Sequence, residues 1–307
     1  LGDVYKRQAN DMMPFLVLFD WDGTITEKDT LALVAPTDDE INGRSLPFLY
    51  YSKEYMKDYD AFKRQFGDTE SMERLLAFMQ DVEQVEQASI HRIMEGELFK
   101  GTSHEQRRKR TNDITFVQGW DHMAAWIQEG ARHNDVWAYV ISVNWSRQFV
   151  LDGLLRGCSA SSSGDMSKDL REVGFRDVIA NEVETDCTGT GTGCILGPEN
   201  NEKRLMLTGI DKLRVMRALQ DEVRQAMPHA PTVFVGDSLT DLACILAADV
   251  GVLMKPSEGY LSKLRQVGMG GQLCMPEAWL ALSWTKRCGA IILADDWKQV
   301  LDLLSRV

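Results

Sequence analysis

The sequence predicts an α/β fold: a doubly wound, Rossmann-like parallel sheet whose core is interrupted by an inserted, all-helical cap domain. Two observations lead to this prediction. Short apolar runs of strand length alternate with helical patterns, as they do when crossover helices join parallel strands. Between residues 29 and 116, strand signals disappear and helical periodicity with dense charge takes their place. A parallel α/β core accounts for the first observation, and an insertion that follows its first strand accounts for the second.

The first strand is predicted at Phe15–Phe19, a run of apolar residues that ends at Asp20. A continuous apolar run of this length indicates a buried parallel strand rather than a half-exposed one. Val136–Ser142 and Thr232–Gly236 give two further strands, and polar residues stand at the end of each. In parallel α/β sheets, ligands bind outside the carboxyl ends of the strands. We therefore expect the functional site at the polar residues that end these strands.

Helices and a late strand complete the predicted core. Asp121–Gly130 and Leu239–Ala248 have helical patterns, and Ala290–Leu293 has the composition of a strand. Asp295 and Asp296 are expected to cap a last helix, because aspartate accepts hydrogen bonds from the free N–H groups of a first turn. The strands and helices thus continue to alternate to the end of the chain.

Helices are predicted within the insertion at Tyr50–Phe66, Met72–Gln80 and Val85–Phe99. We assign residues 12–28 and 117–307 to the α/β core and residues 29–116 to the helical cap. Residues 1–11 are interpreted as a non-native or disordered N-terminus, because Leu1–Gln8 contains neither an initiator Met nor an apolar segment.

Composition favours a cytoplasmic enzyme. The 307 residues include 34 Lys and Arg against 46 Asp and Glu, a net charge of −12 that argues against nucleic acid as a partner. No apolar run approaches the roughly 20 residues of a membrane-spanning helix. The six cysteines lack C-x-x-C spacing and are expected to be free thiols in a reducing compartment.

Carboxylates follow two of the predicted strands. Asp20 and Asp22 lie just past the first strand, where Gly23 allows the chain to curl so that both can reach one site. Asp237 and Asp241 are four residues apart at a predicted helix start and can point toward the same place. Clustered carboxylates repel one another, and with few histidines in the chain they favour a hard cation such as Mg²⁺.

Asp20–Thr26 (DWDGTIT) and Gly236–Asp241 (GDSLTD) resemble the first and last motifs of the haloacid dehalogenase-like superfamily, in its phosphoserine-phosphatase-like branch. The resemblance covers nearly the whole native chain. It implies a phosphatase in which Asp20 is the nucleophile and forms an aspartyl-phosphate. It also implies that Asp22 protonates the leaving oxygen and then activates water. We expect Asp22 to stay protonated because neighbouring like charges raise its pKa.

The resemblance also implies the residues that bind the metal and the phosphate group. Mg²⁺ would be held by Asp20 and Asp237, by the backbone carbonyl of Asp22, and by Asp241 through water. The phosphate-binding residues would be Thr24, Ser142 and Lys212. The inserted helices would form a cap that closes over a small substrate and excludes water.

The substrate-side candidates are Asp29, Asn144 and Trp145. Asp29 stands where phosphoserine phosphatases have a substrate-contacting Glu, and Val143–Ser146 replaces their Gly-Gly. Both departures argue against phosphoserine as the substrate. The Ser-x-Asn-Trp-Ser segment is more similar to fungal and plant members of the branch, among them phosphatase domains associated with thiamin monophosphate. Alternatively, these residues cap or pack the adjoining helices.

The main hypothesis is a Mg²⁺-dependent phosphatase that acts on a small phosphomonoester metabolite. One alternative is a thiamin-monophosphate-type phosphatase. The other is a non-catalytic protein of the same fold that binds a phosphorylated ligand or a protein partner.

Three further motifs are assigned no chemistry. The basic run Arg107–Arg110 resembles a nuclear-localisation or phosphate-binding segment, but a solvated helix surface near a hinge is the favoured interpretation. Ser159–Ser167 is expected to be a mobile surface loop. Thr188–Gly193 is expected to be a hairpin tip or a loose loop and does not match a dinucleotide-binding motif.

Overall fold

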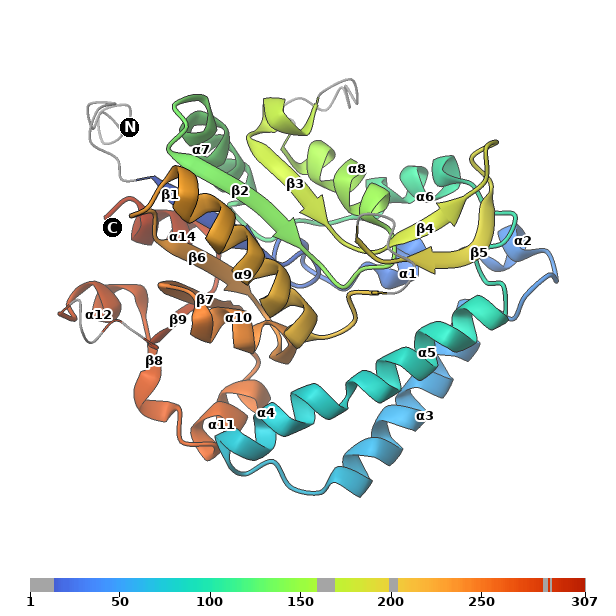
Figure 1. Cartoon of the computed structure of the whole chain (residues 1–307), viewed down its shortest axis with the longest axis horizontal. Coiled ribbons are helices and arrows are strands. Elements are labelled where there is room, and N and C mark those ends of the chain that lie inside the picture. The colour runs from blue at the N-terminus through green and yellow to red at the C-terminus, as the bar shows by residue number, and fades with distance from the viewer. Residues whose placement is uncertain (1–13, 159–168, 199–203, 284–286, 288, 307) are drawn as a thin grey trace.

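A parallel sheet lies at the centre of the computed structural model, which describes residues 14–158, 169–198, 204–283, 287 and 289–306 (Figure 1). Over these residues its strand order is β3-β2-β1-β6-β7-β9-β8, and every neighbouring pair is parallel. The strands are β1 (Phe15–Phe19), β2 (Val136–Ile141), β3 (Phe175–Ile179), β6 (Thr232–Gly236), β7 (Val250–Met254), β8 (Leu273–Cys274) and β9 (Ile291–Ala294). The predicted N-terminal segment 1–11 and the predicted loop Ser159–Ser167 lie outside the described residues.

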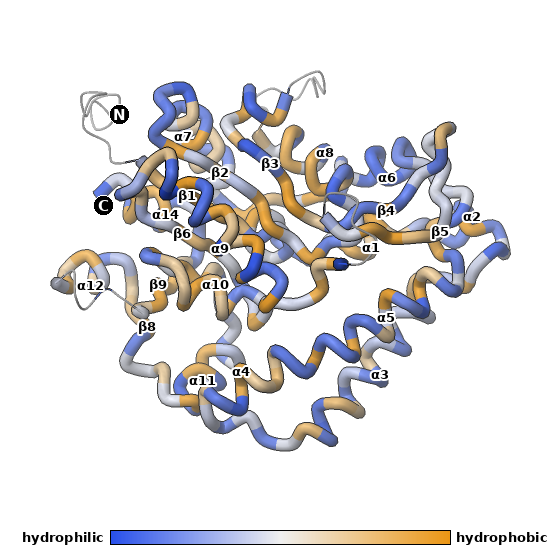
Figure 2. Tube along the Cα trace, in the orientation of Figure 1, coloured by the Kyte–Doolittle hydropathy of each residue, from blue (hydrophilic) through white to orange (hydrophobic). Residues whose placement is uncertain are grey.

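Strand β1 has an apolar residue at every position because both of its faces are buried. Phe15, Val17 and Phe19 belong to one hydrophobic cluster, and Leu16 and Leu18 belong to the other. Figure 2 shows the same pattern, with apolar colour along the central strands. The predicted doubly wound α/β sheet is therefore confirmed.

Helices cover both faces of the sheet. One face packs against α7 (Trp120–Arg132), α8 (Arg147–Gly157), α12 (Pro276–Leu280) and α14 (Trp297–Leu304). The other packs against α9 (Gly209–Ala226), α10 (Leu242–Ala247) and α11 (Glu258–Gln266). The predicted cap of the last helix is also observed, since the Asp296 side chain accepts a hydrogen bond from the Gln299 amide at 2.9 Å. The helix predicted at Leu239–Ala248 is instead a 3₁₀ turn, Leu239–Asp241, followed by α10.

The segment between β1 and α7 is helical. It contains α1 (Leu31–Val34), α2 (Asp38–Ile41), α3 (Phe48–Phe66), α4 (Met72–Asp81), α5 (Glu83–Glu95) and α6 (His104–Arg110). In Figure 1, α3 and α5 run side by side and project from the sheet. The far end of this arm returns to the core, because Leu75 and Met79 of α4 belong to the same hydrophobic cluster as Leu264 of α11. The cap is thus anchored at both of its ends.

A two-stranded antiparallel hairpin, β4 (Glu182–Thr185) and β5 (Gly191–Leu196), contacts the cap. The Gly191 amide donates to the Thr102 carbonyl, and the Gly101 amide donates to the Gly191 carbonyl. A Cβ on Gly191 would lie 2.2 Å from the Phe99 carbonyl oxygen, so this close approach requires glycine. The predicted tip at Thr188–Gly193 is therefore a hairpin turn that continues into β5.

The prediction that Arg107–Arg110 lies on a solvated helix surface is wrong for two of these residues. Arg107 is 1% exposed and donates to the Thr102 hydroxyl. Arg110 binds both carboxylate oxygens of Glu40, at 2.7 and 2.8 Å, and donates to the Leu33 carbonyl. A run of like charges does not reveal which side of a helix meets carbonyl and carboxylate groups. Arg110 thereby joins α6 to the first part of the cap.

No helix within the described ranges is both long and apolar enough to cross a membrane. Among the described residues, Cys187, Cys194, Cys244 and Cys274 are free thiols.

The aromatic contacts of Phe19 should make it a major source of stability. Its side chain is fully buried, with ring centroids 5.5 Å from Trp297, 5.9 Å from Phe175 and 6.0 Å from Trp120. Phe19→Ala should lower the free energy of unfolding by about 3–5 kcal/mol in urea titrations. Leu49→Ala, at a side chain that is 61% exposed, should change it by less than about 0.5 kcal/mol. A Phe19→Ala loss as small as that of the control would contradict this packing account.

Candidate active site

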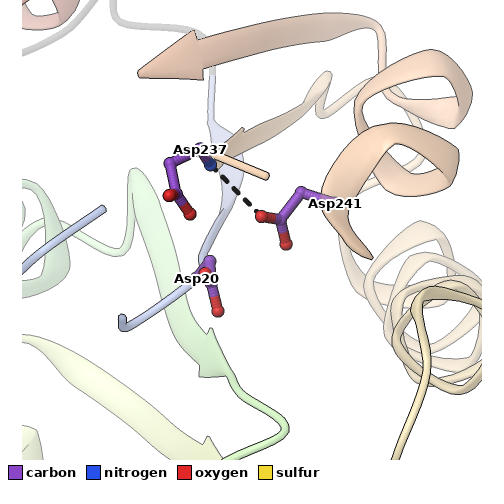
Figure 3. A group of neighbouring side chains, drawn as sticks. All are labelled: Asp20, Asp237 and Asp241. Atoms are coloured by element: carbon purple, nitrogen blue, oxygen red, sulfur yellow. Dashed lines mark hydrogen bonds between the residues drawn. The ribbon is translucent and has the colours of Figure 1, made fainter. Parts of the chain in front are cut away.

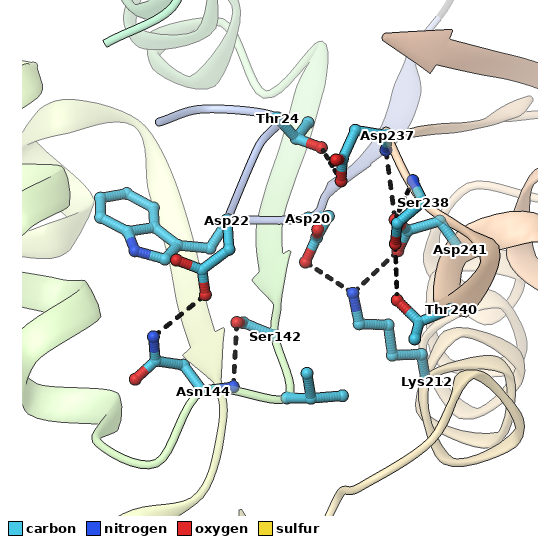
Figure 4. Close-up of polar contacts among 12 residues, drawn as sticks. Asp20, Asp22, Thr24, Ser142, Asn144, Lys212, Asp237, Ser238, Thr240 and Asp241 are labelled. Atoms are coloured by element: carbon cyan, nitrogen blue, oxygen red, sulfur yellow. Dashed lines mark hydrogen bonds and ion pairs between the residues drawn. The ribbon is translucent and has the colours of Figure 1, made fainter. Parts of the chain in front are cut away.

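Four segments meet at the carboxyl edge of the sheet (Figure 4). The parallel register pairs Phe19 with both Val140 and Val235, so the chain leaves β1, β2 and β6 at the same level. The segments are Asp20–Thr30, Ser142–Ser146, Thr208–Lys212 and Asp237–Asp241. The structure thus brings together the residues that the sequence placed after separate strands.

A buried lysine lies at the centre of this group. The Lys212 ammonium donates to Oδ1 of Asp20 at 2.5 Å and to Oδ1 of Asp241 at 2.8 Å, and its side chain is 1% exposed. Burial lowers the pKa of Lys212, but the two carboxylates raise it above its ordinary value. The lysine therefore remains charged and bridges β1 to the segment after β6.

The first turn of α9 places Lys212 in this position. Thr208 and Asp211 form a reciprocal capping box that fixes the start of the helix. Gly209 lies directly against the segment after β6, where a Cβ would come within 2.3 Å of the Thr240 carbonyl oxygen. Any larger residue would push the helix away, so Gly209 sets the approach of the lysine to Asp241.

Three carboxylates gather at this edge of the sheet (Figure 3), beside the lysine (Figure 4). Asp20, Asp237 and Asp241 each offer an oxygen, and these oxygens lie within 4.8 Å of one another. Burial, followed by the charge of Asp241, raises the pKa of Asp20 well above its ordinary value, although Lys212 opposes this shift. Burial and the charge of Asp241 raise the pKa of Asp237 to about 7. The single positive charge of Lys212 is therefore not enough to balance the negative charge of the three carboxylates.

The donor set fits Mg²⁺, which prefers carboxylate and other hard oxygen ligands. A divalent cation would also supply the positive charge that the raised pKa values show to be lacking. Asp20 and Asp237 have carboxylate oxygens available for it. The Asp22 side chain does not belong to this oxygen cluster. Its predicted part in metal binding, through the backbone carbonyl, stays a prediction.

Both oxygens of Asp241 are already engaged. Oδ1 accepts from Lys212, and Oδ2 accepts from the Asp237 amide at 3.2 Å, the Ser238 amide at 3.1 Å and the Ser238 hydroxyl at 2.9 Å. A Cβ on Gly236 would lie 2.4 Å from the Asp241 side chain, so glycine is required there. This arrangement suits the predicted water-mediated contribution of Asp241 better than direct ligation.

Gly23 and Thr24 contact Asp237. Gly23 has a φ of +77°, and a Cβ there would lie 2.3 Å from the Asp237 carboxylate. The Thr24 hydroxyl, predicted to bind phosphate, donates to Oδ1 of Asp237 at 3.3 Å and is fully buried. In the structure, Thr24 therefore orients the Asp237 carboxylate, which belongs to the cluster of three aspartates.

Asp22 points away from this cluster toward the start of the cap. Its Oδ1 accepts from the Thr30 amide at 2.7 Å and from the Thr30 hydroxyl at 2.6 Å, and its Oδ2 accepts from the Asn144 side chain at 3.0 Å. Burial raises the pKa of Asp22 to about 6, and the charge of Asp29 adds to this shift. The predicted direction is thus correct, but its main cause is burial rather than a neighbouring like charge.

The remaining predicted residues differ in their surroundings. Ser142 is fully buried between the two halves of the site, and its hydroxyl accepts from the Asn144 amide at 3.1 Å (Figure 4). Asn144 is also fully buried, and its side chain donates to the Asp22 carboxylate instead of facing a space that a substrate could occupy. Trp145 packs between Phe48 of α3 and Phe99, at ring distances of 5.9 and 6.0 Å. For Asn144 and Trp145 the structure therefore favours positioning and packing over substrate contact.

Asp29 is exposed, and its side chain accepts from the Leu31 amide at 2.7 Å. It thus supports the start of α1, in agreement with the alternative interpretation that these residues cap adjoining helices.

Two buried residues of the site were not predicted. Thr30 binds Asp22, as described above. The Asn181 side chain donates to the carbonyls of Asn144 and Met206 and accepts from the Met206 amide, so it joins the segment after β2 to the one before α9. Thr30 lies eight residues from Asp22 without a pattern to mark it, and Asn181 follows β3, a strand that was not predicted.

Replacing the buried lysine should destabilise the fold. In metal-free buffer at pH 7, Lys212→Met leaves Asp20 and Asp241 without their counter-charge and should lower the free energy of unfolding by about 3–5 kcal/mol. Lys57→Met, at an exposed ion pair, should change it by less than about 1 kcal/mol. Denaturant titrations measure both variants. Equal stability of Lys212→Met and the wild type would contradict the bridging role of the lysine.

Comparisons with known proteins give two sequence relatives, and no protein-family model matches the chain. A CTO1 family protein of Schizosaccharomyces pombe is 27% identical over 246 residues, which cover 80% of this chain and 83% of the relative. Cold tolerance protein 1 of Saccharomyces cerevisiae is 23% identical over 281 residues, covering 80% of each chain.

The structural comparison concerns a substrate-bound phosphoserine phosphatase complex. That structure is 14% identical in sequence and superimposes with a TM-score of 0.50, covering 95% of this chain and 99% of the other. At this identity the likeness establishes the fold and nothing of the substrate. The chain has the haloacid dehalogenase-like fold.

Proposed function

We propose that the chain is a Mg²⁺-dependent phosphatase that hydrolyses a small phosphomonoester through an aspartyl-phosphate intermediate. The observation that carries the proposal is the arrangement of Asp20. Lys212 holds its Oδ1, while Oδ2 accepts no hydrogen bond from any described residue. A buried carboxylate with one fixed and one free oxygen suits a nucleophile.

In the first step, Oδ2 of Asp20 attacks the phosphorus atom and forms the aspartyl-phosphate. The ester P–O bond breaks, and its electron pair stays on the leaving oxygen. Asp22 donates a proton to that oxygen, so the product leaves as an alcohol. The pKa of Asp22, raised to about 6 by burial, favours a carboxylic acid that can hold this proton more readily than an ordinary aspartate can.

In the second step, water attacks the phosphorus atom of the aspartyl-phosphate and gives its proton to Asp22. The acyl-phosphate P–O bond breaks, which releases inorganic phosphate and restores the Asp20 carboxylate. Lys212 supplies positive charge throughout, next to the nucleophile. A bound Mg²⁺ would neutralise part of the charge on the transferred phosphoryl group.

The position of the cap supports a small substrate. Trp145 lies three residues after Ser142, and its ring packs against Phe48 of the cap, so cap and core are in contact beside the site. Such a contact limits the space for a polymeric substrate. The fold shared with a phosphoserine phosphatase supports the class of reaction, whereas the exposed Asp29 and the Val143–Ser146 segment do not favour phosphoserine itself.

Hydrolysis of p-nitrophenyl phosphate tests the proposal. Wild-type protein should release p-nitrophenol with Mg²⁺ and lose this activity in EDTA. Asp20→Asn should reduce kcat by at least about 10³-fold, because the nucleophilic carboxylate is gone. The matched control Asp39→Asn changes an exposed aspartate of α2 and should keep wild-type activity.

Two results would contradict the proposed phosphatase function. One is activity that survives unchanged in Asp20→Asn. The other is an absence of metal-dependent turnover on p-nitrophenyl phosphate and on a panel of phosphorylated metabolites that includes thiamin monophosphate. In the second case, a non-catalytic protein that binds a phosphorylated ligand becomes the better account.

Metal binding can be measured without turnover. Isothermal titration of the wild type with MgCl₂ should show one saturable site. Asp237→Asn removes a carboxylate from the oxygen cluster and should weaken the affinity about tenfold or more. Asp39→Asn should titrate like the wild type. Equal affinity in Asp237→Asn would place the metal elsewhere.

A further inference from the structure

We infer that Thr30 is a positioning residue, whose hydroxyl fixes the direction of the hydrogen bonds at Asp22 and leaves Oδ2 of Asp22 as the oxygen that faces the reacting ester. This inference rests on the proposed phosphatase function. It assigns a role to a residue at the entrance to the cap that no sequence motif marks.

The neighbours of Asn144 determine the orientation of its side chain. The Ser146 backbone amide can only donate, and it lies 3.2 Å from Oδ1 of Asn144. The side-chain oxygen must therefore face Ser146, and the NH₂ group must face the other way. That group donates to Oδ2 of Asp22 at 3.0 Å and to the Thr30 hydroxyl oxygen at 3.1 Å. Both of its hydrogens are thereby used.

The Thr30 hydroxyl receives a second donor. The indole N–H of Trp21, which cannot accept a hydrogen bond, donates to it at 3.2 Å. Two donors occupy both lone pairs of the hydroxyl oxygen, so its single proton has to point outward. The available acceptor is Oδ1 of Asp22, at 2.6 Å. All four residues lie within the part of the chain that the structure describes, and Trp21, Thr30 and Asn144 are 2% exposed or less.

These bonds make the two oxygens of Asp22 unequal. Oδ1 accepts from both the amide and the hydroxyl of Thr30, which fills its two lone pairs. Oδ2 accepts only from Asn144 among the described residues and keeps one position open. In the proposed reaction, the proton that passes to the leaving oxygen therefore departs from Oδ2, and the proton from water returns there. Without the Thr30 hydroxyl, the Asp22 side chain loses one of the bonds that hold this orientation.

Thr30 also links this orientation to the cap. It is the residue immediately before α1, yet its side chain makes no capping bond to that helix. Its hydroxyl is instead used entirely by Trp21, Asp22 and Asn144. Because the Thr30 hydroxyl does not cap the helix, its hydrogen bonds are consistent with a function in the site rather than in the helix.

The test compares two aryl esters that differ in how much they need a proton donor. Phenyl phosphate releases a more basic oxygen than p-nitrophenyl phosphate, so its hydrolysis depends more on Asp22. Thr30→Val keeps the shape of the side chain and removes the hydroxyl. The ratio kcat/KM reports the first step alone, because both esters give the same aspartyl-phosphate. We expect kcat/KM for phenyl phosphate to fall about 10- to 100-fold and kcat/KM for p-nitrophenyl phosphate to fall less than about threefold.

Two further substitutions separate positioning from simple loss of structure. Thr30→Ser restores a hydroxyl and should recover most of the lost activity on phenyl phosphate. Thr37→Val makes the same change at the start of α2, where the hydroxyl only caps a helix, and should leave both activities unchanged. If Thr30→Val does not fold, Trp21→Phe removes one donor to the hydroxyl and should give the same selective loss to a smaller degree.

The inference is overturned if Thr30→Val loses kcat/KM equally for the two esters, or if Thr30→Ser is as defective as Thr30→Val. It is also overturned if neither Thr30→Val nor Trp21→Phe differs from the wild type. All of these outcomes require an active wild type, so they would contradict the role of Thr30 without contradicting the proposed phosphatase function. Wild-type protein that hydrolyses neither ester with Mg²⁺ would instead mark the failure of the proposed function, and the inference would fall with it.

Discussion

A buried lysine ammonium between two aspartates holds the candidate site together. Lys212 reaches Asp20, which follows β1, and Asp241, which follows β6, while its own helix α9 covers the sheet. Buried charges cost free energy unless they are paired, so each of these groups depends on the others. The close contacts at Gly209 and Gly236 are consequences of this constraint, because a side chain at either position would separate the charges. The site is thus part of the packing of the core.

The site has two sides with different electrostatics. On one side, three carboxylates share a single lysine, and the resulting excess of negative charge suits a divalent cation. On the other side, Asp22 is surrounded by neutral donors from Thr30 and Asn144 and lies apart from the carboxylate cluster. Two aspartates only two residues apart therefore experience different surroundings. Such a division is what a reaction needs when one carboxylate attacks and the other transfers a proton.

Much of the sheet could be predicted, because strands that are buried on both faces have continuous apolar runs and their carboxyl ends converge. Strand β3 was not predicted because Arg176 and Asp177 interrupt its apolar pattern at the edge of the sheet. The two-residue β8 was not predicted either, nor was β7, although its buried apolar run resembles those of the predicted strands. At the site, the structure places the two motif segments beside Ser142 and Lys212 at one edge of the sheet, and the chemical roles of these residues stay predictions. Thr30 could not be found, since its importance comes from three partners that only the fold brings close. The burial of Arg107 could not be predicted, because a run of like charges does not show which side of α6 faces the protein interior.

The proposed mechanism depends on the phosphorylation of Asp20 during turnover. Borohydride reduces an acyl-phosphate to an alcohol, so trapping the reaction in mid-turnover should convert residue 20 to homoserine, which mass spectrometry of the peptide detects. The account predicts this conversion only when substrate and Mg²⁺ are both present, with Asp22, Asp237 and Asp241 unmodified. An enzyme that turns over phosphomonoesters while residue 20 stays aspartate, or in which another residue is reduced instead, would contradict the account.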